Sequence, residues 1–183
     1  MQDINSDNLN PMAHEHHRRQ GPSTARFYII TVSTSRYREK MSGGSPRDES
    51  GDLAVEMARE AGHEVVGRDL IPDDMYVIRR RILELVSRDD LDVIVLTGGT
   101  GLTKTDVTIE AVRPLFEKEI EGFGDVFRYF SVQEVGAAAF LTRATAGVIN
   151  GKAVFLLPGS PNAVKTGMKI ILQEISHLLY LIK

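Results

Sequence analysis

The segment LDVIVLTGGTGLTKTD, residues 91–106, decides the expected fold. Its first part, 91–97, is an apolar run of strand length, which is typical of a parallel strand buried on both faces. Five small residues follow at the strand end: Thr97, Gly98, Gly99, Thr100 and Gly101. So much bare backbone after a buried strand indicates either a tight turn or a cradle that presents main-chain N–H groups to an anion.

Segments with strand and helix patterns alternate on both sides of this stretch, which predicts a doubly wound α/β fold: a mostly parallel sheet, helices on both faces, and one antiparallel edge strand. The edge strand follows from the hairpin signal Asn150-Gly151. We expect strands over 26–34, 63–71, 91–97 and, as a hairpin, 148–157; helices over 51–62, 73–88, 107–120 (divided or kinked at Pro114), in pieces over 123–147, and over 161–182; and a loop over 37–50.

Composition narrows the function classes. The chain has 183 residues and a formal net charge of −3, which disfavours a broad nucleic-acid or anionic-membrane surface. It contains no cysteine, which excludes disulfides and thiolate metal sites, and no apolar run approaches the roughly 20 residues that span a bilayer. We therefore expect a cytoplasmic protein with neither a nucleic-acid nor a membrane partner.

The chain divides into a polar N-terminal tail, 1–25, and one domain, 26–183. The tail lacks an apolar secretory core and is expected to be flexible. His14, His16 and His17 lie in it, and we interpret them as solvated rather than as metal ligands.

Three predicted strand ends carry small polar residues, and the carboxyl ends of parallel strands share one edge of a sheet, where ligands bind. They are Thr31 with Ser33, Thr34 and Ser35; Thr97 to Gly101; and Pro158, Gly159, Ser160 and Pro161. Together they favour an oxyanion or phosphate site, although glycines that merely permit turns remain an alternative. The standard P-loop, the dinucleotide fingerprint and the hydrolase nucleophile elbow are absent from the sequence.

Carboxylates near this edge suggest a cation. Asp106 follows the glycines and Asp73 follows a strand, so both could hold Mg²⁺ beside substrate phosphates or handle protons. Each could instead cap a helix. In the loop SPRDESGDL, Ser50 is expected to be an N-cap, and Asp48 could help to hold the metal.

Five ordered blocks, PRDESGDL, LIPDD, TGGTG with DVT, EIEGFGDVFR and LPGSPNAV, resemble the MoaB/MogA family of molybdenum cofactor biosynthesis, more closely the MoaB type. The resemblance covers about residues 27–181. It implies an α/β fold that binds molybdopterin and, in active members, adenylylates it with ATP and Mg²⁺ and releases pyrophosphate. It also implies a homo-oligomer, a trimer or a hexamer.

The resemblance assigns roles to individual residues. It implies Asp106 as the catalytic aspartate and matches Asp73 to the family's second aspartate. The metal ligands that we expect from the residues themselves are Asp106, Asp73 and Asp48. The implied pterin-phosphate contacts are Thr97, Gly98, Gly99, Thr100, Gly101, Pro158, Gly159, Ser160 and Pro161, and the implied nucleotide contacts are Ser33, Ser50 and Gly51.

The chain departs from the family pattern at two positions. Thr34 stands where members commonly carry Asp, and Thr105 where they commonly carry Arg. Lys104 offers a nearby charge but not the planar fork of arginine. A non-catalytic molybdopterin carrier and a mainly structural oligomer therefore stay open beside the enzyme.

Overall fold

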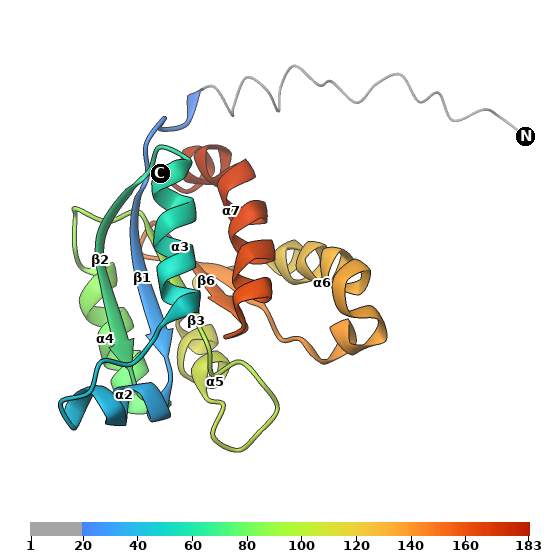
Figure 1. The fold of residues 1–183 in the computed structure, drawn as a ribbon. Coiled ribbons are helices and arrows are strands. Elements are labelled where there is room, and N and C mark those ends of the chain that lie inside the picture. Colours follow the sequence, from blue (N-terminus) through green and yellow to red (C-terminus); the bar gives the residue numbers. More distant parts are fainter. Residues whose placement is uncertain (1–19) are drawn as a thin grey trace, which may run out of the picture.

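The computed structural model of the chain describes residues 20–183. Its sheet has six strands: β1 (Arg26–Val32), β2 (Glu64–Ile71), β3 (Val93–Thr97), β4 (Lys118–Glu119), β5 (Thr145–Ile149) and β6 (Lys152–Leu157). They lie in the order β2-β1-β3-β6-β5-β4 (Figure 1). The first four strands of this order are parallel neighbours, and β5 runs antiparallel to both β6 and β4. The predicted mostly parallel sheet with an antiparallel edge region is confirmed.

Helices cover both faces of the sheet, as predicted. They are α2 (Thr34–Met41), α3 (Glu49–Glu60), α4 (Met75–Val86), α5 (Thr108–Val112), η1 (Arg113–Leu115), α6 (Glu121–Val135), η2 (Gly136–Leu141) and α7 (Pro161–Ile182). Helices α3, α6 and α7 pack on one face, against alternate strand residues such as Phe27 and Ile29. Helices α4 and α5 pack on the other face, against residues such as Ile30 and Leu96.

The apolar residues whose periodicity predicted these elements form the hydrophobic core. Every residue of β3 is buried, as expected for a central parallel strand. On α4, the predicted stripe of Ile78, Ile82 and Leu85 is fully buried. Each such side chain contributes about 1.5 to 3 kcal/mol relative to an exposed position. The hairpin turn is also confirmed, because Asn150 and Gly151 both adopt positive φ values, 48° and 68°.

One predicted loop is partly a helix. Residues 34–41 form α2, which lies beyond the carboxyl end of β2 (Figure 1). None of its residues is buried, so it carries no apolar stripe from which a helix could be predicted. The prediction of a continuous loop over 37–50 was therefore wrong for residues 37–41, and residues 49–50 already belong to α3.

Two other predictions need correction near the edge of the sheet. Helix α5 ends at Val112 and Pro114 opens η1, so the predicted division occurs, but the expected helix then gives way to β4. Residues 145–147 belong to β5 rather than to a helix. Gly147 faces the ring of Phe116, which would lie 2.3 Å from a Cβ at this position. This close packing between distant segments leaves no local signature.

The N-terminal end of the described chain contacts the domain. Ser176 Oγ donates to Pro22 O at 3.0 Å, and the backbone N–H of Ala25 donates to His63 Nδ1 at 3.2 Å. Ala25 is fully buried. The histidines at 14, 16 and 17, and the rest of the predicted tail before residue 20, lie outside the described residues. None of the helices within 20–183 combines the length and apolar character needed to cross a membrane.

Candidate functional site

The carboxyl ends of β1, β3 and β6 meet at one edge of the sheet, because these parallel strands are neighbours (Figure 1). Thr97 Oγ1 donates to Pro158 O at 3.1 Å, and the backbone N–H of Gly98 donates to Leu157 O at 3.0 Å. Towards β1, a Cβ on Gly98 would lie 2.3 Å from Val32 O. The three strand ends that the sequence placed on one edge are therefore in direct contact.

The glycine-rich loop presents two backbone amides away from the protein core. Gly98 and Gly99 have positive φ values, 103° and 64°. Thr108 Oγ1 donates to Gly98 O at 2.8 Å and Thr108 N donates to Gly99 O at 2.9 Å, which directs both carbonyls towards α5. In a trans peptide the N–H points opposite to the C=O, so the N–H groups of Gly99 and Thr100 point away from α5. Neither amide donates a hydrogen bond to any part of residues 20–183.

Asp73 lies beside this loop and is held by Thr34. The backbone N–H and the hydroxyl of Thr34 donate to Asp73 Oδ2 at 2.8 and 2.9 Å, and the Asp73 N–H donates back to Thr34 Oγ1 at 3.0 Å. The other oxygen, Oδ1, faces the loop, because a Cβ on Gly99 would lie 2.8 Å from it. Asp74 instead caps α4 by accepting two N–H groups of its first turn. The two neighbouring aspartates therefore have separate roles.

Asp106 closes the loop that follows the glycines. The backbone N–H of Thr103 donates to Asp106 Oδ2 at 2.9 Å, and the Thr103 hydroxyl donates to the same oxygen. Because α5 begins only at Thr108, the alternative that Asp106 is an N-cap is wrong. Partial burial opposes ionisation, but hydrogen bonds from Thr103 and Gly101 outweigh it and lower the pKa of Asp106. The carboxylate is thus negatively charged at neutral pH.

Asp48 caps α3 and is neutralised by an arginine. Its Oδ1 accepts the N–H of Gly51 at 3.1 Å, so the expectation that Ser50 is the N-cap was wrong. Its Oδ2 accepts from Thr31 Oγ1 and from Arg68, each at 2.7 Å. With both oxygens engaged, Asp48 serves to fix the start of α3 beside β1.

Ser50 connects α3 to the loop after β6. Its hydroxyl donates to Gly159 O at 2.8 Å, and the next residue of that loop, Ser160, caps α7 by accepting the Ala163 N–H at 3.3 Å. Ser33 lies half-buried after β1. The residues predicted to contact nucleotide and those predicted to contact the pterin phosphate therefore adjoin each other at Gly159.

The three carboxylates predicted as metal ligands do not form one cluster. In the part of the chain that the structure describes, no group of three or more acidic or histidine side chains is arranged to hold a metal ion. Asp48 forms an ion pair with Arg68, which makes its carboxylate unsuitable as a metal ligand. Asp73 and Asp106 are engaged by hydroxyls and amides instead. This donor set fits Mg²⁺ that arrives with substrate phosphates and takes one or two carboxylates from the protein.

Arg143 also contacts the glycine-rich loop, although it is not among the residues predicted from the sequence. Its Nε donates to Thr100 O at 3.0 Å, and its two terminal nitrogens bind the carboxylate of Glu110 on α5. Arg143, which lies just before β5, therefore connects the glycine-rich loop to α5. Its sequence signal is weak, because it is a single basic residue inside the block FLTRATAG.

Several known proteins are similar to this chain in sequence and in fold. The family described as "Probable molybdopterin binding domain" matches residues 28–177. A protein of Pyrococcus furiosus named molybdopterin adenylyltransferase is 45% identical over 172 residues, which cover 92% of this chain and 97% of that protein. Molybdenum cofactor biosynthesis protein B of Bacillus cereus is 42% identical over 166 residues, covering 90% and 94% of the two chains.

A solved structure shares the fold. The crystal structure of the tungsten cofactor synthesizing protein MoaB from Pyrococcus furiosus superposes with a TM-score of 0.76 at 46% identity, covering 86% of this chain and 96% of that one. The family match spans most of the chain, and the relatives are covered almost from end to end. The chain therefore belongs to the molybdopterin-binding family of molybdenum cofactor biosynthesis, on the MoaB side of the MoaB/MogA resemblance.

Proposed function

We propose that this chain acts in molybdenum or tungsten cofactor biosynthesis by adenylylating molybdopterin. The name of its Pyrococcus furiosus relative, molybdopterin adenylyltransferase, supports this activity at 45% identity. A terminal phosphate oxygen of molybdopterin attacks the α-phosphorus of ATP. A new P–O–P bond forms, the bond between the α-phosphorus and the bridging oxygen to the β-phosphorus breaks, and pyrophosphate leaves.

The observation that carries this proposal is the pair of unbonded amides at Gly99 and Thr100, which lie beside two carboxylates. Successive backbone N–H groups that point the same way form an anion-binding concavity. They would hold the attacking phosphate, while Ser33, Ser50 and Gly51 would border the nucleotide. Phosphoryl and nucleotidyl transfers need positioning and charge neutralisation more than a covalent protein group. The amides and carboxylates at this edge are the kinds of group that supply these two contributions.

Magnesium is proposed as part of the Mg-ATP substrate. When bound, it would neutralise the charge of the triphosphate and of the leaving pyrophosphate. Asp73 and Asp106 are the proposed ligands, because neither is paired with a lysine or arginine by an ion pair within residues 20–183, whereas Asp48 is paired with Arg68. The protein's contribution is to hold two anionic substrates next to each other without the repulsion that would otherwise separate them.

We also propose that the chain is a homo-oligomer, a trimer or a hexamer. Helix α6 and η2 leave large apolar side chains exposed, including Tyr129, Phe130 and Phe140. Such clustered exposure marks an interaction surface more often than a free one. Light scattering coupled to size-exclusion chromatography gives the subunit number directly, and a monomer at micromolar concentration would exclude both assemblies.

The test of the proposed activity is pyrophosphate release from ATP in the presence of molybdopterin and Mg²⁺. We expect release to require all three components. An alternative is a molybdopterin carrier without catalysis, which the sequence departures at Thr34 and Thr105 favour. A protein that binds molybdopterin tightly but never releases pyrophosphate would establish the carrier and exclude the enzyme.

A further inference from the structure

Thr108 on α5 orients the two amides that are proposed to bind phosphate. Its hydroxyl and its backbone N–H donate to the carbonyls of Gly98 and Gly99. A carbonyl shares its planar peptide group with the N–H of the next residue, so these two hydrogen bonds fix the amides of Gly99 and Thr100. The next peptide group of the loop, which joins Thr100 to Gly101, is held from a different part of the chain.

Arg143 holds this peptide group on its carbonyl side. Arg143 Nε donates to Thr100 O at 3.0 Å. Both terminal nitrogens of the guanidinium bind the carboxylate of Glu110 on α5, which fixes the direction of the Nε–H group. Thr100 is buried, and the side chain of Arg143 is only 28% exposed. The hydrogen bond therefore lies largely out of solvent, where a charged donor acts more strongly than it does in water.

Asp106 holds the same peptide group on its other side. In a trans peptide the N–H points opposite to the C=O, so the Gly101 N–H points away from Arg143. This N–H donates to the carboxylate of Asp106. The approach is close, because a Cβ on Gly101 would lie 2.8 Å from Asp106 Oδ2. One peptide group therefore lies between a guanidinium and a carboxylate, and its dipole has the direction that stabilises both charges.

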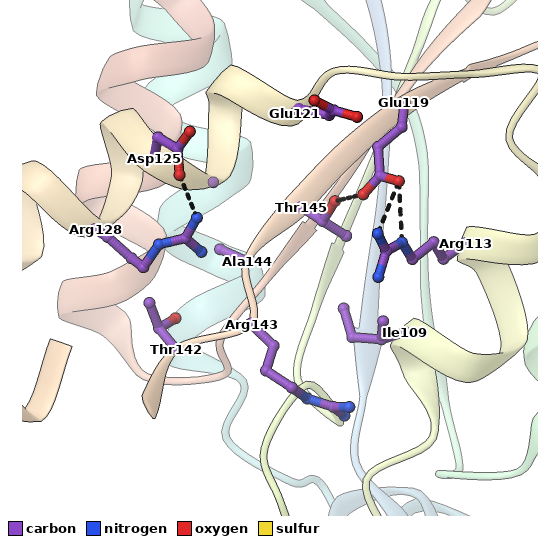
Figure 2. Close-up of a pocket in the computed structure, with 11 residues that line it drawn as sticks. Ile109, Arg113, Glu119, Glu121, Asp125, Arg128, Thr142, Arg143, Ala144 and Thr145 are labelled. Carbon is purple, nitrogen blue, oxygen red and sulfur yellow. Dashed lines mark hydrogen bonds and ion pairs between the residues drawn. The ribbon is translucent and has the colours of Figure 1, made fainter. Parts of the chain in front are cut away.

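Arg143 differs in its partners from two other arginines that line the same pocket, which has a volume of about 410 Å³ (Figure 2). Arg113 forms an ion pair with Glu119, and both residues line this pocket. Arg128 forms an ion pair with Asp125, again within the pocket. Figure 2 shows the guanidinium of Arg143 extending away from both pairs. Of these three arginines, Arg143 is the one that reaches the glycine-rich loop.

We propose that Arg143 is a positioning residue for the adenylylation: through the peptide group between Thr100 and Gly101, it holds Asp106 in the orientation that the transfer requires. The inference rests on the proposed function and adds a residue to it. The peptide groups held by Thr108 bind phosphate, whereas the peptide group held by Arg143 acts on turnover. Because Arg143 donates to the loop and not to a substrate, its loss lowers turnover and leaves the affinity for molybdopterin nearly unchanged.

Steady-state kinetics tests whether Arg143 acts through Asp106. Arg143→Met keeps a long unbranched side chain and removes both the charge and the hydrogen-bond donors. We expect it to lower kcat for pyrophosphate release about tenfold, while the Kd for molybdopterin changes less than about twofold. In the Asp106→Asn background the same substitution should lower kcat no further, because the group through which Arg143 acts is already lost. A general loss of stability would instead lower kcat equally in both backgrounds.

Arg113→Met is the matched control, because it removes an arginine of the same pocket whose ion pair is with Glu119. It should leave kcat unchanged. Glu110→Gln is the second variant should Arg143→Met fail to fold. It loosens the guanidinium without removing it, and should lower kcat less than Arg143→Met does, with the same dependence on Asp106.

Three kinetic results would overturn the proposal. The first is an unchanged kcat for Arg143→Met, or for Glu110→Gln where only that variant folds. The second is an equal fold-loss of kcat in the unmodified and Asp106→Asn backgrounds. The third is a loss of molybdopterin affinity as large as the loss of kcat, which would place Arg143 in binding and not in turnover.

A second readout does not depend on catalysis. In ¹⁵N-labelled protein, the Gly101 amide proton should move upfield in Arg143→Met, because its peptide group loses the charge that polarises the N–H towards Asp106. The amide protons of Gly99 and Thr100 should move far less. If the unmodified chain releases no pyrophosphate, the adenylylation is refuted, and the Gly101 resonance then decides whether Arg143 orients Asp106. A Gly101 resonance that stays in place in Arg143→Met overturns the inference.

Discussion

Gly99 is the position where one added carbon most directly tests the proposed phosphate site. Its φ of +64° is strained for any L side chain, and a Cβ there would lie 2.4 Å from Thr108 Oγ1 and 2.8 Å from Asp73 Oδ1. Gly62 provides a matched control, because its φ is +83° and a Cβ would meet no atom within 4 Å. The two substitutions to alanine share the backbone strain and differ in the contacts.

The magnitudes follow from these contacts. The left-handed conformation costs an alanine about 1 to 2 kcal/mol at either position. At Gly99 the Thr108 hydroxyl must also move, which breaks its buried hydrogen bond to Gly98 O and costs about 1 to 3 kcal/mol more. We therefore expect Gly62→Ala to lose about 1 to 2 kcal/mol of unfolding free energy and Gly99→Ala to lose about 2 to 5 kcal/mol.

Ligand affinity separates the two variants further. If the shifted loop forfeits two charge-assisted hydrogen bonds to phosphate, the loss is about 3 kcal/mol, or a roughly hundredfold rise in Kd for molybdopterin. Urea unfolding at one fixed protein concentration gives the stabilities, and an anaerobic molybdopterin titration gives the affinities. Equal molybdopterin affinity of Gly99→Ala and Gly62→Ala, or equal stability of the two variants, would contradict the role proposed for Gly99.

Three other perturbations test the site and the fold. Asp106→Asn should keep the fold and molybdopterin binding but lower turnover more than tenfold, since it removes a carboxylate whose pKa is already lowered; unchanged pyrophosphate release would contradict this role. Thr34→Val should lower turnover because it removes the two hydrogen bonds that the Thr34 hydroxyl makes with Asp73 and leaves only the backbone one, whereas Thr34→Ser should retain turnover; equal rates for the two variants would show that the hydroxyl is not required. Burial opposes ionisation of Asp92, but hydrogen bonds from Arg26 and Lys183 outweigh the effect of burial and lower the pKa of Asp92. The contribution of Asp92 to the unfolding free energy is therefore complete above about pH 4 and is lost as the pH falls further. Asp92→Asn should therefore cost about 1 to 3 kcal/mol at pH 7, and urea unfolding should show this difference narrowing below pH 4; a constant difference would count against the ion pairs.

The parts of the fold that the sequence predicted correctly carry local signals. Strand β3 is a continuous apolar run, the buried face of α4 repeats at helical spacing, and Asn150-Gly151 has the residue types that positive φ values demand. The failures lack such a signal. Helix α2 buries no residue, and the two-residue strand β4 exists only through its pairing with β5. Tertiary contacts, rather than intrinsic preference, define both elements.

The site divides in the same way. The glycine-rich loop could be predicted from the sequence, because glycines directly after a buried strand indicate main-chain N–H groups that a ligand can approach. The side-chain part of the site could not be predicted in this way, because it depends on partners far apart in the chain. Thr34 and Asp73 are separated by 39 positions, and Arg143 lies 43 positions from the Thr100 carbonyl that it binds. The same holds for the N-cap of α3, where Asp48 and Ser50 are both suitable residue types and only the folded geometry selects Asp48.

The amides of Gly99 and Thr100 are proposed to bind the phosphate of molybdopterin. Nuclear magnetic resonance of ¹⁵N-labelled protein measures this at the two atoms concerned. As molybdopterin is added, the amide protons of Gly99 and Thr100 should move downfield together, in proportion to occupancy, because each gains a charge-assisted hydrogen bond. If molybdopterin binds while these two resonances stay in place, the phosphate is held elsewhere and these amides are not the phosphate site.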